Sequence, residues 1–305
     1  MNIVFMGTPD IAADSLDSLI KAGHNISAVF TKPDKPVGRK QILTPPPVKV
    51  LAEENSIPIF QPETLRDGEA YKIIKEINPD IVVVVAYGKL LPKEILEIAK
   101  FGCINAHASL LPKYRGSSPI QWSIVCGEEK TGITVMQMDE GMDTGDIIST
   151  AEIEIGENET AEELFSRLSV LAGGLLVSTL VSIENGTVKR TPQNEAEASH
   201  APMIRKEMGE LDFSKTAKEI HNLVRGFYSW PCAYTFLNGK RLKVYKTEKV
   251  EASGESGTVI ENEKRLVVAC KEGAIRLLEV QLEGGKRVTD TQFLLGNKIE
   301  LGIKL

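Results

Sequence analysis

The sequence is poor in the features that mark secreted, membrane-spanning and zinc-binding proteins. Its 305 residues include only 4 cysteines, which are widely spaced and have no neighbouring histidine. A zinc site needs ligands that lie closer together, and a chain able to bury large cores does not depend on disulfides. We therefore expect no bound metal and reduced thiols at Cys103, Cys126, Cys232 and Cys270.

Long apolar runs are also missing. No uninterrupted apolar segment approaches about 20 residues, so we do not expect the chain to cross a membrane. The first residues, Met1–Phe5, begin a strand-like run and have neither the basic start nor the long apolar core of a signal peptide. The turn that follows, Gly7-Thr8-Pro9-Asp10, lacks the Gly-x-Gly-x-x-Gly pattern, so NAD or FAD binding is not expected. These absences predict a cytoplasmic protein with no membrane partner.

Excess positive charge is absent from the chain as a whole, but the two halves differ. The net charge is −6. Residues 1–202 carry 18 Lys and Arg against 28 Asp and Glu, a net charge of −10, whereas residues 203–305 carry 18 against 14, a net charge of +4. A basic second half favours a polyanionic partner, although charge alone is equally consistent with ordinary surface variation.

The first 185 residues alternate strand-like apolar runs with helical patterns. The run Ile81–Val85 is β-branched throughout, as is typical of a parallel strand buried on both faces. Such alternation predicts an α/β domain with a doubly wound, mostly parallel sheet, in which ligands bind beyond the carboxyl ends of the strands.

A polar, irregular stretch over residues 186–203 is expected to be a linker. Residues 204–305 then contain one helix and several short strand-like runs, and Asn238-Gly239 between two of them is a strong hairpin signal. We predict a second domain that is a small β-barrel similar to oligonucleotide-binding (OB) folds.

Chemistry-bearing side chains cluster after the strand predicted over 103–105. Asn105 and His107 lie two residues apart, so on extended backbone they point to the same side. Amide, imidazole and carboxylate groups are the parts that stabilise an oxyanion and move a proton in acyl transfer. The spacing does not decide which of Asp139, Asp143 and Asp146 orients the imidazole, and a merely structural Asn–His pair is the alternative. We expect the acidic loop to follow a strand to the same sheet edge.

Two basic segments are candidates for phosphate contacts. One is the long connection over residues 32–47, with Lys35, Arg39 and Lys40, and the other follows the Asn-Gly turn, with Lys240, Arg241 and Lys243. A solvated surface is an equally good explanation for each segment taken alone.

Taken together, these stretches resemble the methionyl-tRNA formyltransferases, within the larger family of 10-formyltetrahydrofolate-dependent formyltransferases. The matching stretches of the first domain are Gly7-Thr8-Pro9-Asp10, Lys32-Pro33-Asp34-Lys35-Pro36-x-Gly38-Arg39, Val84-Val85-Ala86-Tyr87-Gly88, Gly102-Cys103-Ile104-Asn105-x-His107-x-Ser109-Leu110-Leu111-Pro112-x-Tyr114-Arg115-Gly116, Pro119-Ile120-Gln121, the segment 132–139 and Met142-Asp143-Thr144-Gly145-Asp146. Those of the second domain are Ile204-Arg205-Lys206-Glu207, Leu211-Asp212-Phe213 and Trp230-Pro231. The Asn-x-His-x-Ser-Leu-Leu-Pro core is highly specific for the folate-dependent formyltransferases.

The resemblance implies catalytic roles for Asn105, His107 and Asp143. It also implies folate contacts from the residues of the Ser-Leu-Leu-Pro segment, which are Ser109, Leu110, Leu111 and Pro112. It implies contacts with tRNA from the basic residues of the loop and of the second domain, which are Lys35, Arg39, Lys40, Lys206, Lys240, Arg241 and Lys243. Ala108 stands where glycine is frequent in this family, and the run of basic and glycine residues after Arg39 is short.

The expected activity is transfer of the formyl group of 10-formyltetrahydrofolate to the α-amine of initiator methionyl-tRNA, by a monomer. The alternatives are a formyltransferase for a small amine, a hydrolase that releases formate, and a tRNA-binding module with an idle catalytic domain. A small-amine enzyme needs neither the basic loop nor the barrel domain. A catalytically inactive domain is hard to reconcile with the presence of all three of Asn105, His107 and Asp143.

Overall fold

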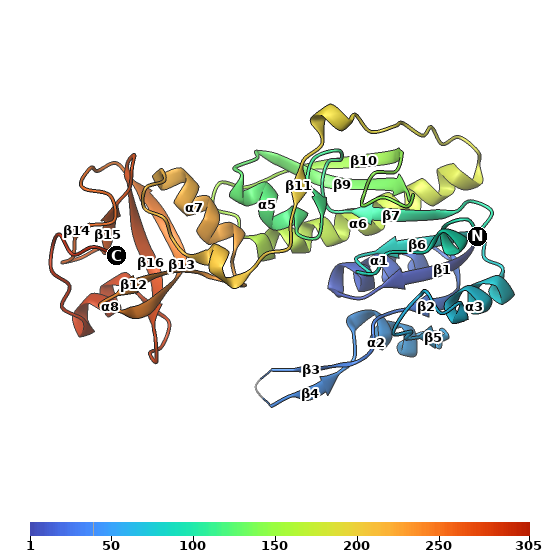
Figure 1. Ribbon diagram of the computed structural model, residues 1–305, viewed down its shortest axis with the longest axis horizontal. Helices are drawn as coiled ribbons and strands as arrows, with labels where there is room; N and C mark the ends of the chain where they lie inside the picture. The colour runs from blue at the N-terminus through green and yellow to red at the C-terminus, as the bar shows by residue number, and fades with distance from the viewer. Residues whose placement is uncertain (39) are drawn as a thin grey trace. The chain divides into compact units, whose positions relative to one another are not determined.

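The computed structural model describes residues 1–38 and 40–305. The chain forms two compact units (Figure 1). The first comprises Met1–Pro119, Lys130–Ile153 and Phe165–Ala201. The second comprises Ile120–Glu129, Glu154–Leu164 and Pro202–Leu305. Each unit has its own core, and each is described separately below.

The first unit is built on a seven-stranded sheet with strand order β10-β9-β7-β6-β1-β2-β5. The strands are β1 (Asn2–Gly7), β2 (Asn25–Phe30), β5 (Ile59–Phe60), β6 (Ile81–Val85), β7 (Cys103–His107), β9 (Lys130–Gln137) and β10 (Ile147–Glu154). The pairings β1–β2, β1–β6, β2–β5 and β6–β7 are parallel, whereas β9 runs antiparallel to β7. The expected mostly parallel α/β sheet is therefore confirmed.

The sheet is buried on both faces at its centre, as the apolar run in β6 predicts. All five residues of β6 are buried. On one face, Val82 and Val84 pack with Ile74 of α3 (Glu69–Ile77) and Ile95 of α4 (Lys93–Leu96). The remaining helices of the chain's first half are α1 (Asp10–Lys21), α2 (Pro47–Glu54) and α5 (Pro119–Val125).

Helix α6 (Ala161–Glu184) is long and apolar enough to cross a membrane when judged by length and composition alone. Core helices of globular proteins share these properties. Leu168, Ala172 and Leu176 are fully buried, and a Cβ on Gly173 would overlap Ser18 of α1. This close approach to α1 shows that α6 packs in the core of the first unit.

Two short strand pairs complete the first unit. The hairpin of β3 (Lys35–Val37) and β4 (Ile42–Thr44) is exposed along its length and extends away from the sheet (Figure 1). Strand β8 (Arg115–Gly116) pairs in parallel with β11 (His200–Ala201). Because of this second pairing, the segment after α6 returns to the sheet edge where β7 ends.

The second unit contains an antiparallel sheet with strand order β12-β13-β16-β15-β14, and β17 pairs with β16. The strands are β12 (Ala233–Leu237), β13 (Lys240–Val250), β14 (Val259–Glu261), β15 (Val267–Ala269), β16 (Ala274–Leu282) and β17 (Val288–Thr289). Asn238 and Gly239 both have positive φ and turn β12 into β13, as expected. This antiparallel β domain agrees with the fold class predicted for the second half.

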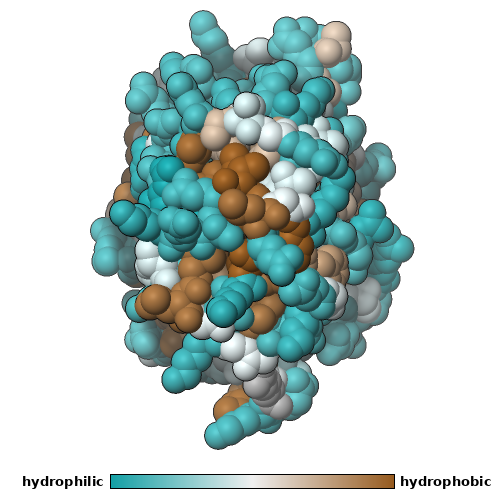
Figure 2. Space-filling view, turned by 90° about the vertical axis from the view of Figure 1, so that its left-hand side faces the viewer, coloured by the Kyte–Doolittle hydropathy of each residue, from teal (hydrophilic) through white to brown (hydrophobic). Residues whose placement is uncertain are grey.

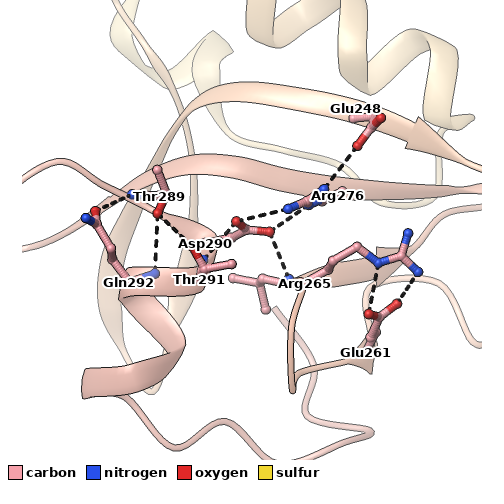
Figure 3. Close-up of polar contacts among 9 residues, drawn as sticks. Glu248, Glu261, Arg265, Arg276, Thr289, Asp290, Thr291 and Gln292 are labelled. Carbon is pink, nitrogen blue, oxygen red and sulfur yellow. Dashed lines mark hydrogen bonds and ion pairs between the residues drawn. The ribbon is translucent and has the colours of Figure 1, made fainter.

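Helices α7 (Ala217–Gly226) and α8 (Asp290–Gly296) belong to the second unit, as does α5 from Ile120 onward. The Asp290 carboxylate is buried at the start of α8, where it accepts hydrogen bonds from Arg276 Nε at 2.7 Å and from the Leu266 backbone at 3.4 Å (Figure 3). Figure 2 shows the face of this unit that carries β14, β15 and α8, where apolar side chains gather and hydrophilic ones surround them. Leu295 and Leu301 are strongly exposed.

Candidate active site

Asn105 and His107 both lie on β7, which extends two residues beyond the predicted 103–105. Pairing with β9, in which His107 lies opposite Thr134, accounts for the longer strand. Because side chains alternate along a strand, the two residues project from the same face of the sheet. Asn105 is half-buried, and His107 is 6% exposed, so the site is sheltered from bulk water but open at the amide.

Both nitrogens of the His107 ring face oxygen atoms. Its Nε2 lies 2.9 Å from the Tyr114 carbonyl oxygen. A carbonyl only accepts hydrogen bonds, so Nε2 carries a hydrogen in this arrangement. Its Nδ1 lies 3.6 Å from Oδ2 of Asp143. The imidazole thus makes one hydrogen bond, to the Tyr114 carbonyl, and lies beside the Asp143 carboxylate, which is beyond hydrogen-bond distance.

Of the three acidic candidates, Asp143 is the one beside the imidazole. Its Oδ2 also accepts a hydrogen bond of 2.8 Å from the Gly116 backbone. The carboxylate of Asp139 is instead engaged by Thr144 Oγ1 at 2.7 Å and by the Gly141 backbone. Asp143 has a φ of 56°, in the left-handed region, which costs an L-residue about 1–2 kcal/mol.

The acidic loop reaches the site by an unexpected path. Because β9 is antiparallel to β7, it ends beside Ile104 near the start of β7. The expectation that this loop follows a strand to the carboxyl-terminal edge is therefore wrong. The loop folds back along β7 instead, and Asp143 contacts His107 from that loop.

Three residues near the site were not singled out from the sequence. Gln193 donates hydrogen bonds to the carbonyls of Asp143 and Gly145, and Arg115 donates to both Gln193 and Glu195. The bond to Glu195 raises the pKa of Arg115, and the same bond lowers the pKa of Glu195. Arg115 belongs to the motif after β7, but no pattern of the irregular segment 186–203 indicates where Gln193 and Glu195 lie.

The residues with implied folate contacts follow β7 directly. Ser109 is fully buried, and its hydroxyl donates a 2.6 Å hydrogen bond to the Lys113 carbonyl. Its own carbonyl accepts from Thr134, which also accepts from the Leu111 backbone. Leu110 and Pro112 are half-buried. The Ser109 side chain therefore braces this turn, while Leu110 and Pro112 are accessible to a ligand.

Cys103 is the cysteine nearest to the site in sequence, and its surroundings make it a poor nucleophile. It is fully buried, and burial raises the pKa of its thiol to about 12. The thiolate is the reactive form, so this residue stays inert near neutral pH. Within residues 1–38 and 40–305, no group of histidine, cysteine and acidic side chains is placed to hold a metal ion.

The basic candidates lie on the surfaces of the two units. Lys35 and Lys40 are exposed on the β3–β4 hairpin, and Arg39 lies outside the described residues. In the second unit Lys206, Lys240 and Arg241 are exposed and Lys243 is half-buried. The Arg241 guanidinium lies 4.1 Å from the centre of the Tyr234 ring, so a cation and an aromatic face are stacked at the β12–β13 hairpin.

Comparisons with known proteins identify the family. Residues 1–180 match the Formyl transferase family, and residues 203–298 match its C-terminal domain. The methionyl-tRNA formyltransferase of Clostridioides difficile is 49% identical over 308 residues, covering 100% of both chains. That of Geobacter metallireducens is 48% identical over 306 residues, covering 100% of this chain and 98% of the relative. The chain belongs to the methionyl-tRNA formyltransferase family.

Solved structures with the same fold include more distant formyltransferases. The N-formyltransferase from Helicobacter canadensis, in complex with folinic acid and dTDP-3-aminofucose, is similar with a TM-score of 0.70 at 24% identity, covering 90% of this chain and 98% of that one. HypX from Aquifex aeolicus, in complex with tetrahydrofolic acid, has a TM-score of 0.64 at 15% identity, covering 99% of this chain and 50% of that one. At such low identities the similarity establishes the formyltransferase fold alone.

Proposed function

We propose that this protein transfers the formyl group of 10-formyltetrahydrofolate to the α-amine of initiator methionyl-tRNA in the cytoplasm. The observation that carries the chemistry is the cluster of an amide, an imidazole and a carboxylate at the end of β7, with Asp143 Oδ2 3.6 Å from His107 Nδ1. Full-length identity to methionyl-tRNA formyltransferases supports the choice of acceptor.

Formyl transfer creates negative charge that the site is equipped to stabilise. The unprotonated amine attacks the formyl carbon and forms a new C–N bond. The bond between the formyl carbon and the folate nitrogen breaks, and a proton passes from the amine to that nitrogen. During this step the formyl oxygen gains negative charge. In our proposal Asn105 and His107 donate hydrogen bonds to it, and preorganised donors of this kind are the main source of catalysis in such sites.

Asp143 has two tasks in this scheme. Its carboxylate lies 3.6 Å from Nδ1 and limits the orientation of the imidazole, and it helps the proton to pass between the amine and the leaving nitrogen. Because His107 Nε2 donates to the Tyr114 carbonyl, the formyl oxygen replaces that carbonyl as the acceptor when substrate binds. The ring therefore needs only a change of partner at Nε2, with its Nδ1 side held in place.

We further propose that the two units bind the tRNA backbone through separate basic surfaces. Lys35, Arg39 and Lys40 contribute from the β3–β4 hairpin. Lys206, Lys240, Arg241 and Lys243 contribute from the second unit, where the exposed Arg241 guanidinium, supported by the buried Tyr234 ring, offers a surface for stacking on bases. The folate is contacted by Leu110 and Pro112. Ser109 and Leu111 brace the turn that presents them.

The salt dependence of catalysis tests this choice of acceptor against a small amine. Four phosphate contacts give a slope of about −3 in a plot of log affinity against log salt, so kcat/KM for methionyl-tRNA should fall on the order of 50-fold between 50 and 200 mM salt. Free methionine and an amino-sugar nucleotide serve as small acceptors in parallel assays. Transfer to one of them that is faster and insensitive to salt would overturn the proposal.

A further inference from the structure

The side chain of Gln193 links the segment after α6 to the acidic loop of the site. Its amide nitrogen Nε2 donates one hydrogen bond to the Asp143 carbonyl and one to the Gly145 carbonyl, each 2.8 Å long. An amide has two N–H donors, so both are used on this one loop. Gln193 thus clamps the backbone on both sides of Thr144.

Arg115 fixes the other end of the same amide. Its Nε and Nη2 donate to the Gln193 oxygen at 3.0 and 2.8 Å. Its Nη1 and Nη2 donate to the Glu195 carboxylate at 2.9 and 2.7 Å. Arg115 is 3% exposed, so its guanidinium is shielded from water, whereas the Glu195 side chain is 71% exposed. The next residue, Gly116, donates its backbone N–H to the Asp143 carboxylate.

The acidic loop needs such an external hold. Asp143 is in the left-handed region, which Asp adopts more readily than most L-residues when its side chain bonds locally, whereas here the carboxylate bonds the distant Gly116. On the other side, the loop packs tightly, because a Cβ on Gly145 would overlap the Gln137 carbonyl. The position of the Asp143 carboxylate relative to His107 therefore depends on what holds the Asp143 backbone.

We propose that Gln193 is a positioning residue. Held by Arg115, it fixes the backbone of Asp143 and so sets the contact between the Asp143 carboxylate and the His107 ring. It touches no reacting atom, and its effect on formyl transfer passes through Asp143. The proposal rests on the proposed function for its kinetic test, but its structural part can be measured without any reaction.

Two substitutions of Gln193 test the donor end and the acceptor end of its amide separately. Gln193→Met removes the donors and the acceptor at similar size. Gln193→Glu keeps an acceptor for Arg115 but replaces the donors by oxygens that repel the two carbonyls. Asn194→Ala is the matched control, since within residues 1–38 and 40–305 the Asn194 side chain bonds only inside its own turn, to Ala196 and Glu197.

The kinetic test measures steady-state transfer of labelled formyl to methionyl-tRNA, with the substrates in excess over the enzyme. Displacements of about 1 Å in an active site cost on the order of 100-fold. We expect both Gln193 variants to lower kcat at least fivefold, with KM within twofold of the parent and Asn194→Ala unchanged. In an Asp143→Asn background, Gln193→Met should change kcat by at most twofold, because the effects of two residues that act through the same group are not additive. The proposal is overturned if the Gln193 substitutions lower kcat less than fivefold in the parent protein, or if Gln193→Met changes kcat more than twofold in the Asp143→Asn protein.

Amide hydrogen exchange provides the independent readout. Exchange over residues 139–146 should be at least tenfold faster in Gln193→Met and Gln193→Glu than in the parent, and unchanged in Asn194→Ala. Equal exchange rates in all four proteins would refute the positioning role even if the chain transfers formyl. Conversely, faster exchange in a chain that shows no transfer would leave the positioning intact and reject the proposed function.

Discussion

At the scale of single residues, His107 carries the most consequence. Its Nε2 donates to the Tyr114 carbonyl, and the Asp143 carboxylate lies 3.6 Å from its Nδ1. The donor at Nε2 is the one that the proposed scheme presents to the formyl oxygen. Its removal should therefore affect the rate of the chemical step more than the binding of either substrate.

We predict that His107→Ala lowers kcat for formyl transfer on the order of 100- to 1,000-fold, the usual effect of losing one oxyanion donor. The measurement is single-turnover transfer, with circular dichroism to verify the fold. His24→Ala is the control, because His24 follows α1 and lies outside the site. A folded His107→Ala protein with near-normal turnover would remove His107 from the mechanism.

Some of this site was predictable from the sequence and some was not. The period-2 alternation of a strand is local, so it was sufficient to place Asn105 and His107 on one side. The contact of Nε2 with the Tyr114 carbonyl depends on the irregular turn after β7, which returns to the ring within seven residues, and the hold of Gln193 on Asp143 depends on backbone that returns from 50 residues further along the chain. No local pattern encodes such returns, and so the three acidic candidates stayed open until the resemblance pointed to Asp143.

At the scale of elements, strand direction was the main thing that the sequence did not provide. The apolar pattern of residues 130–137 is the same for a parallel and an antiparallel strand. Its direction is set by pairing with β7, which comes from the whole sheet. By contrast, the Asn238-Gly239 turn depends on local residues and lies between β12 and β13 as expected. Residues 204–305 contain the two helices α7 and α8, where one helix was expected.

Helix α7 contains a buried histidine whose titration should be visible in stability. His221 is 4% exposed, its Nδ1 accepts from Thr247 Oγ1, and its Nε2 faces the Glu157 carbonyl. Burial is the largest cause that lowers its pKa, and Arg225 and Lys249 lower it further, whereas the Glu157 carbonyl and carboxylate raise it. The neutral ring is therefore the form that fits the folded protein.

A lowered pKa in the folded state means that the unfolded chain binds more protons just below pH 6.5. The free energy of unfolding should fall as pH drops from 7 to 5, with a slope from this group of at most about 1.4 kcal/mol per pH unit. His221→Gln should remove that part of the slope. Urea unfolding at three pH values in this range is the measurement, and identical slopes in the two proteins would disprove the assignment.

Helix α8 begins at a buried charge pair that should matter for the second unit. Asp290 is 2% exposed and bonds Arg276 and the Leu266 backbone (Figure 3). Asp290→Asn should lower the free energy of unfolding by about 2 kcal/mol, since it weakens charge-assisted bonds that water cannot replace. Glu248→Gln is the control, because Glu248 is exposed and its 3.4 Å contact with Arg276 should contribute little. Equal denaturation midpoints for the two variants would contradict this account.

At the scale of the whole molecule, the two units divide the work that the proposed function requires. The first carries the amide, imidazole and carboxylate at the end of β7, together with the exposed β3–β4 hairpin. The second adds an antiparallel sheet with exposed cations on its β12–β13 hairpin. The charge difference between residues 1–202 and 203–305 fits this division, because only the second part has a net positive charge.

The most direct test of the central claim is acid-stable transfer of labelled formyl from 10-formyltetrahydrofolate. The acceptors are initiator methionyl-tRNA, the same tRNA without methionine, and free methionine. We predict label on the charged tRNA and none on the other two. Consumption of the folate with no label on methionyl-tRNA would contradict the account and indicate a formyltransferase for a small amine or a hydrolase.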